Sequence, residues 1–163
     1  MSISDFERFT GVLALAVVAY LVVMAIPRVR RELDGSAAAV LGLVISGGAT
    51  AGSLALSWGL GLEPCELCWF QRIFMYPLPI LIGLGLAWGW REIRRFVVAL
   101  ASIGAAISVY HLVVQWVPGT GSCSVDNPCS SRIFEFLGFV SIPAMALIAF
   151  AGTIVAMLTW RES

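Results

Sequence analysis

Residues 35–62 read GSAAAVLGLVISGGATAGSLALSWGLGL, a run of 28 positions without a charged side chain. A helix that crosses a bilayer needs about 20 predominantly apolar residues. The run exceeds that length, so Gly59-Leu60-Gly61 near its end is predicted to leave the membrane as a loop. On either side of this run, other stretches also lack charged residues; they cover residues 9–27, 73–90, 96–125 and 136–160.

Composition places the whole chain in a membrane. Its 163 residues are 60% apolar and 12% charged, whereas a soluble domain has about a quarter of its residues charged. Backbone groups in hydrocarbon must bond one another, and the apolar runs do not alternate, so the spans are predicted to be helices rather than barrel strands. The expected fold is an all-α membrane protein with five spans, near residues 10–26, 37–58, 72–90, 96–117 and 137–159.

Arginine placement predicts the orientation. The chain has ten arginines, no lysine and ten acidic residues, with no basic tract of the kind that nucleic-acid binding requires. With five spans, seven arginines fall on one side, which the positive-inside rule makes cytoplasmic: Arg28, Arg30, Arg31, Arg91, Arg94, Arg95 and Arg161. The N-terminus is then outside and the C-terminus cytoplasmic, and the loops at residues 59–71 and 118–136 are extracytoplasmic.

The first apolar stretch could instead be a cleaved signal peptide. Such a peptide carries positive charge before its apolar run and a small-residue cleavage site after it. Here Asp5 and Glu7 precede the run together with Arg8, and Ala25-Ile26-Pro27 is a poor cleavage site. We therefore expect a spanning helix at this position.

All four cysteines fall in the two predicted extracytoplasmic loops, where disulfides persist. Cys65 and Cys68 form a C-x-x-C pair directly before a predicted helix, whose positive end favours the thiolate that attacks disulfides. Cys123 and Cys129 enclose turn-forming residues that let their loop fold back. This pattern favours redox chemistry, but inert structural disulfides or a four-thiolate zinc site use similar spacings.

Three polar residues accompany the cysteines. Arg72 follows Cys68 by four positions and shares its helix face, where it could stabilise a thiolate or an anion such as a reduced quinone. Simple snorkelling of Arg72 to the membrane boundary is the alternative. Gln71 adjoins it as a hydrogen-bond donor. His111 lies near the outer end of the fourth span, either as an ordinary hydrogen-bonded histidine or as a residue that contacts a quinone head group or relays protons.

Other patterns predict packing and boundaries rather than chemistry. Small residues at four-residue spacing in the second span predict a close helix approach at Gly42, Ser46, Gly48 and Gly52. Prolines predict helix kinks at Pro77, Pro79 and Pro143. An aromatic belt at the span ends is predicted from Trp58, Trp69, Trp88, Trp90, Trp116 and Trp160.

Over residues 37–160 the chain resembles the DsbB family, especially its shorter BdbC-like branch. The motifs that carry the resemblance are PCELCWFQRIFMYP, SVYHLVVQWVPG, CSVDNPC and FLGFVSIPAMALIAF. The resemblance implies a DsbB-like four-helix bundle in a prokaryotic cell membrane. It also implies an enzyme that reoxidises a DsbA-like thioredoxin-fold partner and passes two electrons to a membrane quinone, either ubiquinone or menaquinone.

The resemblance also implies roles for the cysteines. Cys68 would face the quinone, Cys65 would exchange with Cys129, and Cys123 would form the mixed disulfide with the partner. Arg72 matches the arginine that the family places by the quinone, whereas Gln71 and His111 match less closely. No metal is expected.

The chain departs from the family pattern in two places, its N-terminal segment and its second cysteine loop. Residues 1–35 are expected to add an N-terminal transmembrane helix and a cytoplasmic loop before the bundle of residues 36–163. The second loop is short, and Ser131–Phe136 is the expected remnant of a longer interfacial segment.

Two other functions are compatible with these motifs. A vitamin-K-epoxide-reductase-like enzyme would share the bundle, the C-x-x-C motif and the quinone. Its C-x-x-C motif lies late in the chain, however, whereas Cys65 and Cys68 precede the second helix of the bundle. A non-enzymatic membrane scaffold with structural disulfides or zinc is the other alternative.

Overall fold

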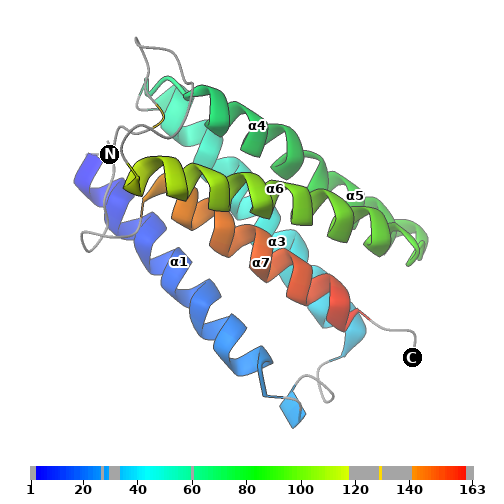
Figure 1. Cartoon of the computed structure of the whole chain (residues 1–163). Coiled ribbons are helices and arrows are strands. Elements are labelled where there is room, and N and C mark those ends of the chain that lie inside the picture. The colour runs from blue at the N-terminus through cyan, green and yellow to red at the C-terminus, as the bar shows by residue number, and fades with distance from the viewer. Residues whose placement is uncertain are drawn as a thin grey trace.

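A computed structural model of the chain describes residues 3–26, 28–29, 34–59, 61–117, 129 and 141–160. Every regular element within these ranges is a helix, so the predicted all-α fold is confirmed (Figure 1). In chain order the helices are α1 (Ile3–Met24), α3 (Gly35–Leu54), the π-helical turn η1 (Ala55–Gly59), α4 (Glu66–Met75), α5 (Pro77–Trp88), α6 (Ile93–Trp116) and α7 (Ile142–Thr159).

Four segments are long and apolar enough to cross a membrane: Gly35–Gly59, Glu66–Trp88, Ile93–Trp116 and Ile142–Thr159. They agree with four of the five predicted spans, and the chain is a multi-pass membrane protein. The apolar part of α1, Thr10–Met24, is shorter than these four. A fifth crossing by α1 therefore stays a prediction.

Close contacts at glycine hold the bundle together around α7. Phe150 of α7 is fully buried, and its ring occupies the place that a side chain at Gly104 of α6 would need. A β-carbon at Gly42 of α3 would lie 2.8 Å from Cε of Met157 and 3.2 Å from Cβ of Ala156. Such approaches bring backbones together and supply the van der Waals contacts that drive helix association in lipid.

The third predicted span is divided into two helices. Helix α4 ends at Met75, Tyr76 follows, and α5 begins at Pro77, which cannot donate a backbone hydrogen bond. Of the two prolines at which a kink was predicted in this span, Pro77 lies directly after the interruption, whereas Pro79 lies inside α5, where the helix continues.

The kink predicted at Pro143 is wrong, because Pro143 lies in the first turn of α7, just after Ser141 and Ile142. The N–H of a residue in the first turn has no intrahelical partner, so proline is tolerated there. The expected start of this span, residues 137–140, lies outside the described residues.

Two packing predictions need correction. Gly42 does make a close contact, but a β-carbon at Gly48 or Gly52 would meet nothing within 4 Å, so these two glycines leave open space. Trp160 is 4% exposed and packs beside Gly85, unlike the other five tryptophans, which are exposed. Trp160 is therefore a core residue rather than part of an aromatic belt.

A short turn joins α5 to α6. Gly89 has a φ of 65°, the left-handed conformation that glycine adopts without strain, and α6 begins at Ile93. Arg94 in the first turn of α6 donates a hydrogen bond of 2.8 Å from Nη1 to the Trp160 carbonyl, directly after α7. That bond satisfies a carbonyl at the C-terminal end of α7, where a cation is favourable.

Candidate functional site

The start of α4 holds the first cysteine pair. Cys65 is the residue before the helix, and Cys68 lies inside its first turn. The prediction that both cysteines precede the helix is therefore wrong for Cys68. Both are free thiols, and their Sγ atoms lie 2.9 Å apart. At this separation one thiol can donate a hydrogen bond to the other, and a small movement would join them in a disulfide.

His111 of α6 lies against this pair. It is 2% exposed, and its Nε2 lies 3.8 Å from Sγ of Cys65 and 3.1 Å from the carbonyl oxygen of Cys129. Its Nδ1 lies 3.4 Å from Nε2 of Gln71, which is also buried. The carbonyl can only accept, so we assign the proton to Nε2, which leaves Nδ1 to accept from Gln71.

Cys129 is brought to the same place from the second loop. It is disulfide-bonded and buried, and it packs with Cys65 and Val114 in a small apolar cluster that Cys68 borders. Cys123 and Ser131–Phe136 lie outside the described residues. The structure thus places one cysteine of the second pair beside Cys65.

The surroundings of Cys65 favour its thiolate. The hydrogen bond with the Cys68 thiol lowers the pKa of Cys65 to about 4, with help from His111 and from the backbone N–H of Cys68. Partial burial acts in the opposite direction but is the weaker effect. Cys65 is therefore set up as the more nucleophilic sulfur when both thiols are reduced.

Arg72 of α4 reaches across to α3 and η1. Its Nη2 donates to the Ser57 hydroxyl at 2.7 Å and to the Ser53 carbonyl at 3.2 Å, and its guanidinium lies 5.5 Å from the Trp69 ring centroid. These contacts fix the cation on the protein side of α4. The sequence pattern did not single out Ser53 or Ser57, because two serines in an apolar helix are as often packing residues.

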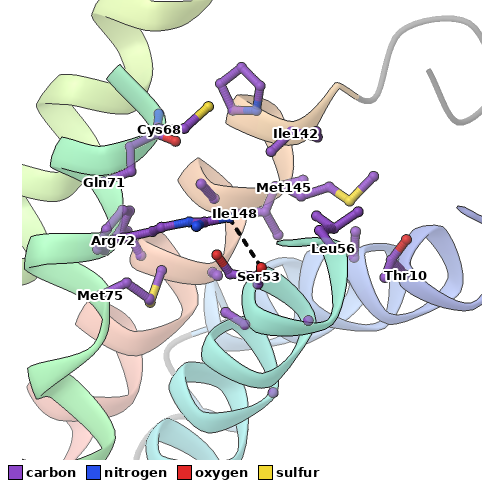
Figure 2. A pocket seen from close by; sticks show the side chains of 18 of the residues that line it. Thr10, Ser53, Leu56, Cys68, Gln71, Arg72, Met75, Ile142, Met145 and Ile148 are labelled. Atoms are coloured by element: carbon purple, nitrogen blue, oxygen red, sulfur yellow. Dashed lines mark hydrogen bonds between the residues drawn. The ribbon is translucent and has the colours of Figure 1, made fainter. Parts of the chain in front are cut away.

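Arg72, Gln71 and Cys68 line one cavity of about 490 Å³, which Figure 2 shows between α1, α3, α4 and α7. The dashed line in that view marks the contact between Arg72 and Ser53. Cys65, His111 and Cys129 also line the cavity. Most of the remaining lining is apolar and includes Leu56, Met75, Ile142, Met145 and Ile148.

Cys65, Cys68 and His111 also form a possible metal-binding group. Their ligand atoms all lie within 4.8 Å of one another, so this group could hold a metal ion. Two thiolates and an imidazole are ligands that Zn²⁺ accepts in proteins. The sequence-based expectation of no metal stays untested.

Several known proteins that are similar to this chain are named as disulfide bond formation proteins. The chain is 42% identical over 112 residues to "Disulfide bond formation protein C" of Bacillus subtilis (strain 168), which covers 67% of this chain and 81% of that protein. It is 43% identical over 105 residues to "Probable disulfide formation protein C" of Bacillus cereus, covering 63% of this chain and 76% of the relative.

A further relative is "SPbeta prophage-derived disulfide bond formation protein B" of Bacillus subtilis (strain 168). It is 38% identical over 104 residues, which cover 63% of this chain and 70% of that protein. No solved structure matches the chain significantly.

The family described as "Disulfide bond formation protein DsbB" matches residues 30–160, a region that contains α3 to α7 and all four cysteines. Its named activity agrees with the free thiol pair of α4 and with the disulfide-bonded Cys129 beside it. The chain belongs to the DsbB family of disulfide bond formation proteins and is a membrane thiol oxidoreductase.

Proposed function

We propose that this oxidoreductase takes two electrons from a DsbA-like partner of thioredoxin fold and passes them to a membrane quinone. The observation that carries the proposal is the arrangement around α4. Cys65 packs with Cys129 of the second loop, and both Cys65 and Cys68 line a largely apolar cavity together with Arg72. A dithiol pair between a second disulfide and a lipophilic site can relay electrons from one to the other.

The cavity residues fit a quinone. Ligand pockets of 300–1,000 Å³ with apolar walls and few polar groups hold drug-sized ligands, and this cavity measures about 490 Å³. Arg72 and Gln71 are donors suited to the carbonyl oxygens of a head group and to the negative charge that develops on reduction. When bound, a quinone supplies a two-electron acceptor, which equals the oxidation of one dithiol.

The proposed electron path passes through all four cysteines. The partner's thiolate attacks Cys123 of the second-loop disulfide and releases the Cys129 thiolate. Resolution of the mixed disulfide frees the oxidised partner and leaves Cys123 and Cys129 as thiols. Cys129 then attacks Cys65 in a Cys65–Cys68 disulfide and releases Cys68 as a thiolate, and Cys123 resolves the Cys65–Cys129 bond.

This exchange restores the second-loop disulfide and leaves Cys65 and Cys68 reduced. The described residues match that stage, because Cys65 and Cys68 are free and Cys129 is disulfide-bonded. Reoxidation of Cys65 and Cys68 then releases two electrons beside Arg72.

We also propose the membrane arrangement predicted from the arginines. Both cysteine loops are extracytoplasmic, residues 1–35 form an additional N-terminal span with its loop, and the bundle occupies residues 36–163. The hydrogen bonds that connect Cys65, His111 and the Cys129 carbonyl support a common side for the two cysteine pairs. Disulfide chemistry in an oxidising compartment requires that side to face outward.

A zinc-binding scaffold is the second candidate, and it is favoured by the convergence of Cys65, Cys68 and His111. The two candidates predict opposite zinc contents. A scaffold purified without chelators would carry one zinc per chain and no titratable thiol, whereas an oxidoreductase would carry little zinc and show two reactive thiols after reduction.

Single-turnover oxidation of a reduced thioredoxin-fold partner, with added quinone in detergent, tests the proposed function. The unmodified protein should form one quinol per partner oxidised. Cys68→Ala should stop quinol formation, and Cys123→Ala should stop oxidation of the partner. Normal partner oxidation by Cys123→Ala would contradict the role assigned to the second loop, and stoichiometric zinc would favour the scaffold.

A further inference from the structure

The cavity beside Arg72 extends far beyond the thiols. Its lining on α1 runs from Thr10 to Tyr20, and on the facing side it runs from Leu41 of α3 to Leu56 of η1. At about 1.5 Å per residue, these ranges span roughly 15 and 22 Å along the two helices. The cavity of about 490 Å³ is therefore an elongated slot along the two helices, and exposed lining residues such as Leu13 and Val44 leave it partly open to the surface.

The walls of the slot are apolar away from its polar end. The lining includes Leu13, Ala14 and Val17 of α1 and Leu41, Val44 and Ile45 of α3. Gly48 and Gly52 form part of the α3 wall, and a β-carbon at either would meet nothing within 4 Å. A slot of this shape and chemistry suits a hydrocarbon chain that lies parallel to the helices.

Helix α1 is held in place as the outer wall by α7. A β-carbon at Gly152 of α7 would lie 2.7 Å from Cγ1 of Val17 and 3.3 Å from Cδ1 of Ile45. Gly152 therefore brings α1 and α3 together at one side of the slot, and Figure 1 shows α1 along α7. In Figure 2, Thr10 of α1 and Leu56 lie near the same space as Arg72.

The family match begins at residue 30 and so excludes α1, which ends at Met24. We propose that α1 and α3 bind the prenyl tail of the acceptor whose head group lies at Arg72. In this proposal α1 makes the protein selective for quinones with a long tail. The proposal rests on the quinone-dependent function above and deepens it, because it adds a tail subsite that the matched region does not contain by itself.

The test compares two quinones with the same head group, one carrying several prenyl units and one carrying only a methyl group. Gly48→Leu places a side chain in the slot, where the open space permits it, and leucine is a better helix former than glycine. Ala51→Leu is the matched control, because Ala51 is an exposed position of the same helix that does not line the cavity. Binding is measured by quenching of tryptophan fluorescence, with co-purified quinone content as a second readout.

Gly48→Leu is expected to weaken the Kd for the prenylated quinone about tenfold or more, since each buried methylene contributes about 0.8 kcal/mol. The Kd for the methyl quinone should not change, and Ala51→Leu should leave both values unchanged. Leu13→Trp, which narrows the slot from α1, should repeat the selective loss. It also replaces Gly48→Leu as the test should that variant fail to fold.

The outcomes separate the two proposals. If the unmodified protein binds neither quinone, the quinone-dependent function is wrong. If it binds both quinones equally well, or if Gly48→Leu and Leu13→Trp keep the unmodified affinity for the prenylated quinone, the tail subsite is wrong and the head-group site at Arg72 stands.

Discussion

Nε2 of His111 lies 3.8 Å from Sγ of Cys65, although the two residues are 46 positions apart in the chain. The same nitrogen is 3.1 Å from the Cys129 carbonyl, so one imidazole contacts both cysteine segments.

Cys65 should react with iodoacetamide at a pH well below that of an ordinary cysteine, because its pKa is lowered to about 4. Between that value and the usual range near 8.5, it is a thiolate here but a neutral thiol in a peptide. The reaction rate of Cys65 in the reduced protein is measured by mass spectrometry against pH. A midpoint near that of free cysteine would contradict the prediction.

The hydrogen bond from Cys68 is the largest cause of this shift, and His111 contributes less. Cys68→Ala should therefore move the alkylation midpoint of Cys65 upward by more than His111→Ala does. Cys68→Ser, which keeps a hydroxyl donor, should move it less than Cys68→Ala. The reverse order for Cys68→Ala and His111→Ala would assign the shift to the imidazole instead.

Arg72→Lys should raise the KM for quinone and leave the KM for the thioredoxin-fold partner unchanged. Lysine cannot reproduce the planar contacts of Arg72 with Ser57, Ser53 and Trp69. Ser57→Ala should give the same pattern with a smaller effect, roughly fivefold, since it removes one hydrogen bond that positions the guanidinium. An unchanged quinone KM in Arg72→Lys would assign Arg72 to simple snorkelling.

Gly104→Val should destabilise the bundle, because the buried Phe150 ring occupies the space that any side chain at Gly104 would need. Overpacking of this kind costs about 1–3 kcal/mol. Thermal unfolding in detergent measures the loss. Gly48→Ala is the control, because a β-carbon there meets nothing, and its midpoint should stay unchanged or rise slightly.

The predicted orientation is checked by labelling introduced cysteines with a membrane-impermeant maleimide, in a background that lacks the four native cysteines. Ser2→Cys should be labelled from outside the cell, because five spans place the N-terminus there. Glu92→Cys, in the turn between α5 and α6, should be labelled only after the membrane is opened. Labelling of both positions from outside would contradict the five-span arrangement.

Much of the fold could be predicted because hydropathy depends on short stretches of sequence. The four spans and the break at Pro77 follow from local rules, and so does the position of Arg72 one turn after Cys68. The kink predicted at Pro143 was wrong because the sequence does not distinguish a proline in the first turn of a helix from one in its interior when the start of the helix is unknown.

The contacts between side chains in the site could not be predicted from the sequence. The contact of His111 with Cys65, and that of Arg72 with Ser57, depend on how α3, α4 and α6 are rotated against one another. That rotation is determined by tertiary contacts such as the one between Gly104 and Phe150. Gly42 and Gly48 were both predicted to allow a close helix approach. Gly42 does pack against α7, whereas Gly48 lines a cavity, because the rotation of α3 also decides what each glycine faces.

The turn at Gly89 has a consequence for how the protein is made. Helices α5 and α6 are separated by only the few residues from Gly89 to Glu92, too few to reach across a bilayer. Neither helix can therefore cross without the other, and the pair must enter as a hairpin. In the proposed orientation Arg91 and Arg94 at its tip stay on the side of synthesis while both helices insert, because carrying them through hydrocarbon is costly. The biogenesis of the bundle is thus constrained by its shortest connection.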